Sequence, residues 1–253
     1  MSSINLSQTG EEHVYNIMNY KKIINDSIIK GSNLESNLPE EKLTFDSGSP
    51  PGCWGMSGTK GRNFLNNIVN NYDDCNYLEI GTHTGSTLCS ALYGNKNTGN
   101  TYSIDNFAWS KTIVERENTL LKLNSNILKY VPHISSTHQH FTEDCFSISP
   151  LEKGINNIDI YFFDAGHSEE DHYNALTHYI DCMSRNFIYI VDDWVGSGGQ
   201  VVRTGTINAI NDLNLTARLF KEQPENYSKQ TDAPSDPEEW WNGFGIFILE
   251  KPE

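Results

Sequence analysis

The sequence has few basic residues, no closely spaced cysteine pair and no long apolar run, and each absence excludes a class of protein. Its 18 Lys and Arg residues stand against 33 Asp and Glu residues, which gives a net charge of −15. No basic cluster that would suit nucleic acid or an anionic membrane surface occurs. The five cysteines are an odd number without a C-x-x-C pair, as expected of a reduced cytoplasmic protein. The polar N-terminal residues predict neither a secretion signal nor a membrane span.

A repeated alternation of short apolar runs and amphipathic segments begins near residue 61. The pattern predicts strands at 77–80, 101–104, 134–140, 158–163 and 187–191, and helices at 61–71, 86–93, 111–128, 145–151, 169–183 and 203–213. Two final apolar runs, 216–220 and 244–249, have no helix between them. Repeated strand–helix units predict an α/β, doubly wound, Rossmann-like and mostly parallel seven-stranded sheet with a C-terminal antiparallel hairpin.

The chain is predicted to divide into two regions. Residues 1–53 are expected to form an N-terminal helical extension or lid, with a helix over 11–30 that ends at Gly31. Residues 54–253 are expected to form the main domain. The long polar, proline-bearing segment between the last two strands predicts a lid or an insertion.

The first predicted strand runs into a carboxylate and a glycine turn, E-x-G-x-x-x-G, formed by Glu79, Gly81 and Gly85. A dinucleotide-binding turn needs G-x-G-x-x-G to receive a pyrophosphate, and one of those glycines is missing here. An acid at this point suits a ligand with cationic or hydroxyl groups, such as the methionine end of S-adenosylmethionine. Asp105, some 20 residues after the turn, is then placed for ribose hydroxyls. The alternative is a purely structural turn with a strand-capping Glu79.

Each predicted parallel strand also brings polar residues to the edge where ligands bind in doubly wound sheets. Asp164, Asp192 and Asp193 follow two of these strands, and three converging carboxylates would raise one another's pKa values unless a hard cation such as Mg²⁺ or Mn²⁺ bound them. His167 lies beside this group and suits a general base. The alternatives are a helix-capping or solvated role for the aspartates and for His167. Further residues expected at the same edge are His83, Thr87, Asn106, Glu143 and Asp144.

Together these motifs, over about residues 54–250, resemble the class I S-adenosylmethionine-dependent methyltransferases, and more narrowly the metal-dependent small-molecule O-methyltransferases of the macrolide-sugar and catechol types. The resemblance implies that Met56 and Ser57 contact the methionine part of the cofactor and that Thr87 contacts its carboxylate. It assigns ribose to Asp105 and adenine to the loop with Asp144 and Cys145, where Glu143 and Cys145 replace a usual glycine and serine.

Asp164-x-x-His167 and Asp192–Asp193 are the most specific matches. In the sugar-modifying branch, such residues supply the metal ligands and the base, whereas the catechol branch usually has a lysine at the base position. His167 therefore favours a sugar or glycan-terminus acceptor, such as a deoxysugar like rhamnose, over a catechol or phenol. Trp54, Trp240 and Trp241 are candidates for apolar walls over the acceptor, although core packing is the commoner role of such residues.

Two other classes of protein stay open from the sequence. One is an NAD-dependent oxidoreductase or epimerase on the same type of sheet, and the other is a binding domain without activity. The missing glycine of the turn disfavours the first, and the intact set of acids with His167 disfavours the second. The expected partner is a small-molecule or glycan acceptor, with no nucleic acid or membrane, and a homo-oligomer is left open.

Overall fold

The structure is a computed structural model that describes residues 6–38, 55–96, 98–195, 198–225 and 239–252. A single seven-stranded sheet runs through it in the order β3-β2-β1-β4-β5-β7-β6. The five parallel strands are β1 (Cys75–Ile80), β2 (Thr98–Ile104), β3 (His138–Phe141), β4 (Ile158–Phe163) and β5 (Met183–Val191). The antiparallel strands β6 (Thr216–Gln223) and β7 (Phe244–Glu250) complete one side, so the predicted fold class is confirmed.

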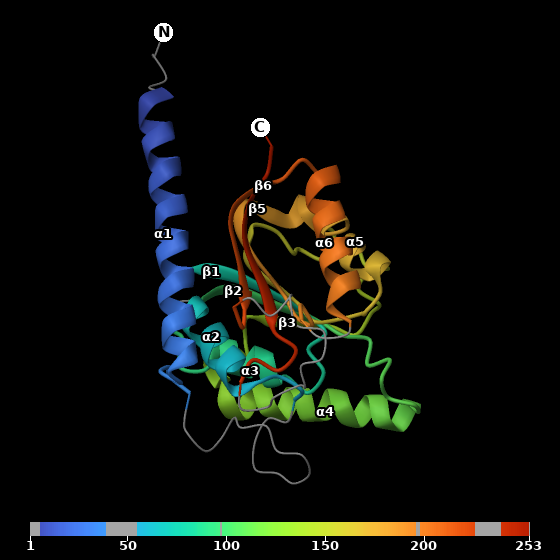
Figure 1. Ribbon diagram of the computed structural model, residues 1–253. Helices are drawn as coiled ribbons and strands as arrows, with labels where there is room; N and C mark the ends of the chain where they lie inside the picture. Colours follow the sequence, from blue (N-terminus) through green and yellow to red (C-terminus); the bar gives the residue numbers. More distant parts are fainter. Residues whose placement is uncertain (1–5, 39–54, 97, 196–197, 226–238, 253) are drawn as a thin grey trace.

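Helices cover both faces of the sheet (Figure 1). One face carries α1 (Leu6–Ser32), α2 (Thr59–Asn70), α3 (Ser86–Leu92) and α4 (Ile113–Tyr130). The other carries α5 (Glu169–Thr177) and α6 (Gly199–Asp212). Because side chains alternate along a strand, neighbouring residues of β4 enter different cores: Phe162 packs on the α2 side and Phe163 on the α5 side.

The helix α1 is longer than predicted and extends past the body of the domain in Figure 1. Its C-terminal half packs against α2 through the buried Ile23 and Ile24. Among the described residues, no helix is long and apolar enough to cross a membrane. The predicted lid between β6 and β7 falls mostly on residues 226–238, and Trp54 falls within 39–54; both ranges lie outside the described residues.

Three predicted elements differ from the structure for local reasons. The strand predicted from residue 134 begins only at His138, because Pro132–Ile134 forms a 3₁₀ turn with proline at its start. No helix forms over 145–151, where the loop is closed instead by turns around Asp144. The helix predicted to reach 183 ends at Thr177, since the chain turns through Ile180–Cys182 and enters the nine-residue strand β5.

The first glycine of the E-x-G turn is required by close packing between β1 and β4. Gly81 has a φ of +91°, and a Cβ at this position would lie 1.8 Å from the carbonyl oxygen of Asp164. Its backbone N–H donates to the carbonyl of Ile104, at the end of β2. The turn therefore draws the carboxyl ends of β1, β2 and β4 together, and this edge of the sheet carries the site.

Candidate active site

A cavity of about 640 Å³ opens at the carboxyl ends of the parallel strands. This size is usual for a small-molecule site. The turn after β1 lines one end of the cavity, the loops after β2 and β3 line the middle, and the loops after β4 and β5 line the other end with Trp241 and Asn242. The predicted residues among its lining are Met56, Ser57, Gly81, His83, Thr87, Asp105, Asn106, Glu143, Asp144, Cys145, Asp164, His167, Asp192 and Asp193.

Three residues that line the cavity, two of them at the glycine turn, carry a hydroxyl group without a partner in the described chain. The Oγ atoms of Ser57 and Ser86 and the Oγ1 of Thr82 are buried and have no hydrogen-bond partner in the described chain. Buried polar atoms are nearly always hydrogen-bonded in folded proteins, so such a group indicates a missing polar ligand or water. The set therefore fits the polar methionine end of the expected cofactor. Of these three residues, only Ser57 is predicted from the sequence to contact the cofactor.

Glu79 lies behind this turn and does not line the cavity. Its Oε2 accepts a hydrogen bond from the hydroxyl of Tyr77 at 2.7 Å, and its Oε1 accepts one from Thr87 Oγ1 at 2.8 Å. Burial raises the pKa of Glu79 to about 7, although these hydrogen bonds partly offset the shift. The carboxyl group thus joins β1 to the start of α3, and it reaches the cavity only through Thr87.

The end of β2 presents a carboxylate that is already fixed by two backbone donors. The N–H of His83 donates to Asp105 Oδ2 at 2.6 Å, and the N–H of Phe107 donates to Oδ1, also at 2.6 Å. Each carboxylate oxygen can accept a second hydrogen bond, so Asp105 stays available to a pair of ribose hydroxyls. Asn106 Nδ2 donates to Asp144 Oδ2 at 3.2 Å and ties this loop to the one after β3.

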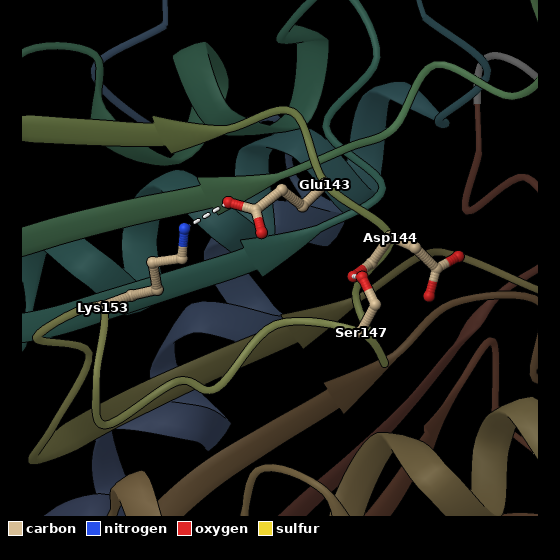
Figure 2. Close-up of polar contacts among 4 residues, drawn as sticks. All are labelled: Glu143, Asp144, Ser147 and Lys153. Carbon is tan, nitrogen blue, oxygen red and sulfur yellow. Dashed lines mark hydrogen bonds and ion pairs between the residues drawn. The ribbon is translucent and has the colours of Figure 1, made fainter.

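Figure 2 shows the loop after β3, which was assigned to adenine. Glu143 forms an ion pair with Lys153 that holds its side chain along the sheet, whereas the carboxylate of Asp144 points in another direction. The hydroxyl of Ser147 donates to the backbone carbonyl of Asp144 at 2.9 Å and closes the turn. Burial raises the pKa of the Cys145 thiol to about 12, so this side chain stays protonated and uncharged near neutral pH. Glu143 stands where the related methyltransferases usually have glycine, and its ion pair with Lys153 leaves no unpaired negative charge.

At the opposite end, the half-buried Asp164 and the buried Asp192 form a pair of carboxyl groups. Burial, together with the negative charges of neighbouring aspartates, raises the pKa of both well above the usual range. The two groups are hydrogen-bonded to each other, yet Asp192 Oδ1 is buried without a partner in the described chain. An orphaned carboxylate oxygen beside a second carboxyl group fits a hard cation, since Mg²⁺ is commonly held by one or two carboxylates with water and substrate oxygens.

Both carboxylate oxygens of Asp193 have a partner outside this pair. Its Oδ2 lies 2.7 Å from His167 Nε2, and its Oδ1 accepts a hydrogen bond from Asn242 Nδ2 at 2.6 Å. Burial alone would raise the pKa of Asp193, but the contacts with His167 and Asn242 hold it below its ordinary value. In return, the hydrogen bond to Asp193 raises the pKa of His167. Across the described residues, no group of three or more His, Cys, Asp or Glu side chains is arranged to hold a metal ion, so the three predicted ligands are not gathered into one such group.

Backbone strain is concentrated around the cavity. Four of the non-glycine residues with positive φ line it: His83 (+47°), Phe107 (+52°), Asp193 (+54°) and Trp241 (+55°). Such conformations each cost about 1–3 kcal/mol and tend to persist at functional sites, where surrounding structure enforces them. Trp241 therefore belongs to the site, whereas Trp240 is 3% exposed and packs against Phe64 and Phe244 in the core.

The cavity is acidic throughout. Seven carboxylate residues line it, and none of the described lining residues is a lysine or an arginine; the seven are Asp105, Glu143, Asp144, Asp164, Asp171, Asp192 and Asp193. Lys153 neutralises Glu143 from outside the lining. The remaining field favours a cationic ligand and disfavours an anionic one such as a pyrophosphate.

The profile of a family of methyltransferase domains matches residues 78–194, which run from β1 through β5 to the start of the following loop. This part of the chain is thus similar to methyltransferase domains. The match agrees with the resemblance to class I S-adenosylmethionine-dependent methyltransferases that the motifs indicate.

Solved structures share the fold of the methyltransferase domain. The O-methyltransferase TomG of Streptomyces achromogenes, in complex with SAM, is 15% identical with a TM-score of 0.52, over 89% of this chain and 90% of TomG. An O-methyltransferase from Bacillus cereus in complex with SAH is 15% identical with a TM-score of 0.52, over 92% and 91% of the two chains. At this identity the likeness concerns the fold alone.

Two longer chains described as candidate methyltransferases, one of them from Streptococcus mutans, are matched over 49% and 47% of their own lengths. This chain therefore spans about half of those proteins. No curated protein matches the sequence.

Proposed function

We propose that the methyltransferase domain moves a methyl group from S-adenosylmethionine to a hydroxyl group of a sugar or glycan terminus, with the help of a divalent cation. The acidic cavity is the observation that carries this proposal. S-adenosylmethionine brings a sulfonium and an ammonium group, and both charges suit a cavity whose described lining has acidic residues but no lysine or arginine. NAD would bring a pyrophosphate into the same field, which disfavours the oxidoreductase alternative.

Three groups of residues would hold the cofactor. The orphaned hydroxyls of Ser57, Thr82 and Ser86 suit its amino-acid end, and Asp105 suits its ribose. The loop around Asp144 and Cys145 suits the adenine ring. When bound, S-adenosylmethionine supplies an electrophilic methyl group on sulfur, so the protein has to align an acceptor oxygen and remove its proton.

Asp164 and Asp192 would hold the divalent cation, and Asp193 stays a predicted third ligand. The orphaned Asp192 Oδ1 supports this assignment, because a cation would satisfy this oxygen and offset the repulsion between two neighbouring carboxylates. A bound Mg²⁺ or Mn²⁺ supplies a Lewis acid that lowers the pKa of an acceptor hydroxyl.

His167 is the proposed general base. Its Nε2 faces the carboxylate of Asp193, and a neutral imidazole that donates from Nε2 keeps its lone pair on Nδ1. The proton of the acceptor hydroxyl would therefore pass to Nδ1. Asp193 stabilises the imidazolium that results, as an aspartate does beside a catalytic histidine in other enzymes.

The sugar acceptor is supported by the type of residue around this end of the cavity. Histidine stands where the catechol-type enzymes usually have lysine, and the aromatic rings of Trp109 and Trp241 line the cavity. Trp109 is 74% exposed, so its ring is accessible to an acceptor. Exposed aromatic faces above carboxylates suit a polyhydroxyl ring, which offers both apolar C–H faces and hydroxyl groups.

Transfer of labelled methyl groups from S-adenosylmethionine to a panel of glycosides and catechols tests the proposal. We expect glycosides to be methylated, turnover to stop in EDTA, and Mg²⁺ or Mn²⁺ to restore it. Asp164→Asn should weaken both metal binding and turnover, whereas Asp181→Asn, on an exposed residue outside the cavity, should change neither.

Two results would contradict parts of the proposal separately. Turnover that survives exhaustive EDTA treatment would remove the cation. Methylation of catechols but of no glycoside would replace the sugar by a phenolic acceptor and leave the cofactor assignment intact.

A further inference from the structure

The short segment that leads into β7, residues 240–243, supplies an amide to the acidic end of the cavity. Asn242 lies in sequence far from every motif of the methyltransferase domain, beyond the matched residues 78–194. Its Nδ2 nevertheless donates to Asp193 Oδ1 at 2.6 Å, while the other oxygen of Asp193 lies 2.7 Å from His167 Nε2. The three side chains form a continuous chain of contacts, and all three line the cavity.

The backbone around Asn242 is fixed from both sides. The N–H of Val195 donates to the carbonyl of Asn242 at 2.8 Å, and the N–H of Trp194 donates to the carbonyl of Gly243 at 3.1 Å. Gly243 has a φ of +77°, and a Cβ there would lie 2.4 Å from the carbonyl oxygen of Gln223. The buried ring of Trp240 anchors the other end of the segment between Phe64 and Phe244. Asn242 is thus presented by a rigid turn.

Asp193, which accepts the hydrogen bond from Asn242, is also firmly held. Asp193 adopts a φ of +54°, which is unfavourable for a residue with a side chain and needs support from its surroundings. The following residues pair with the turn before β7 through the two backbone hydrogen bonds above, and the Asp193 carboxylate completes this pairing through Asn242. The rotamer of Asp193 is therefore defined by Asn242 as much as by His167.

We infer that Asn242 is a positioning residue, which holds Asp193 and through it the imidazole of His167 in the orientation that methyl transfer uses. The inference rests on the proposed function. His167 itself is 56% exposed and has little packing to orient its ring, so its contact with Asp193 is the main constraint on it. Because Asn242 fixes the Asp193 carboxylate, His167 keeps its proton on Nε2, which faces that carboxylate. Its Nδ1 then remains able to take the proton of the acceptor hydroxyl.

Asn242→Asp tests the inference, because it keeps the size of the side chain and replaces the amide donor by a carboxylate. Three further proteins complete the set: His167→Ala, the double variant, and Asn124→Asp, which adds the same charge on an exposed position of α4 outside the cavity. The measurements are kcat and KM for both substrates, the Kd of S-adenosylhomocysteine by calorimetry, and the tautomer of His167 by ¹⁵N NMR on the full chain.

We expect Asn242→Asp to lower kcat by about 10–100-fold, the usual effect of losing a supporting hydrogen bond. The Kd of S-adenosylhomocysteine should stay within about twofold, and the NMR signal of the Nε2–H tautomer should be lost. In the double variant, Asn242→Asp should add nothing to His167→Ala, because both changes act on the same step. Asn124→Asp should behave as the wild type.

The inference is overturned if the His167 tautomer is unchanged in Asn242→Asp, or if the two losses multiply in the double variant. A loss of S-adenosylhomocysteine binding in parallel with kcat would also overturn it, since that result indicates general damage to the domain. If His167→Ala keeps the wild-type kcat, the proposed base is wrong, and the NMR tautomer alone then decides whether Asn242 positions the ring.

Discussion

A catalytic role and a structural role of His167 predict different experimental results. It is more than half exposed and contributes little to the core, so His167→Ala should leave the midpoint of thermal unfolding nearly unchanged. As a general base it should account for about 10²–10⁴-fold in kcat. The affinity for S-adenosylhomocysteine should persist, because the base contacts the acceptor.

His133→Ala is the matched control, since His133 is exposed and outside the cavity. The assignment fails if His167→Ala and His133→Ala give the same kcat.

Glu79 gives a residue-scale prediction about stability and pH. The pKa of Glu79 is about 7 in the folded chain and 4.5 for an ordinary glutamate. As the pH rises, the unfolded chain therefore loses this proton at a lower pH than the folded chain does. The stabilisation is complete below pH 4.5 and is lost as the pH rises to about 7. A shift of this size corresponds to about 3 kcal/mol. Glu79→Gln should therefore be more stable than the wild type above pH 7 but not at pH 4.5.

Urea unfolding at several pH values checks this expectation, with Glu117→Gln on an exposed position of α4 as the control. Parallel stability curves for wild type and Glu79→Gln would show that the buried carboxyl group is ionised without penalty.

At the scale of elements, the sequence predicted most strands of the sheet well and some helix ends poorly. β4 is a nearly continuous run of apolar residues between turns, which is the pattern expected of a strand that is buried on both faces. The error at α5 arose because apolar residues continue past Thr177 into β5, so hydrophobicity alone does not mark the change from helix to strand. The absent helix after Cys145 was replaced by side-chain-to-backbone hydrogen bonds at Asp144, which compete with helix formation.

A network of asparagine side chains fastens the segment after α1 to the methyltransferase domain. Asn66 on α2 is fully buried; its Nδ2 donates to the carbonyls of Ser90 and Tyr93, and its Oδ1 accepts from the N–H of Asn37. Asn66→Ala leaves these groups unsatisfied and should lower the free energy of unfolding by about 2 kcal/mol or more.

Asn124→Ala, on an exposed position of α4, should cost little. Hydrogen exchange is expected to rise first at residues 33–38 in Asn66→Ala. Equal stability of the two variants would mean that the network does not hold the segment.

At the scale of the whole molecule, the predictable part of the site is the part that lies next to strands. Asp105, Asp164, Asp192 and His167 follow strand ends, and topology brings strand ends to one edge. Asn242 could not be found this way, because it follows no parallel strand, lies between the antiparallel strands β6 and β7, and belongs to no motif. The orientation of Asp193 could not be predicted either. The sequence gives no sign that the backbone leaves the extended conformation of β5 at this residue, where φ is +54°.

One buried and two half-buried histidines make the stability of the whole molecule sensitive to acid. Burial lowers the pKa of His138, His140 and His172 to about 4, so each is neutral in the folded chain and protonated earlier in the unfolded one. Their stabilisation is complete above pH 6.5 and is lost as the pH falls toward 4. The histidines thus lower the stability as the pH falls, whereas Glu79 raises it. The pH dependence of the wild-type stability alone therefore does not separate the two effects.

His172→Leu separates them. His172 is 1% exposed and meets the ring of Phe163 edge-on, with 5.3 Å between the ring centroids. An apolar side chain of similar size removes the cost of protonating a buried ring, so stability near pH 7 should change little. Toward pH 4 the variant should gain up to about 3 kcal/mol over the wild type. His133→Leu, at an exposed position, should show no such gain, and a His172→Leu curve parallel to the wild type from pH 7 to 4 would refute the assignment.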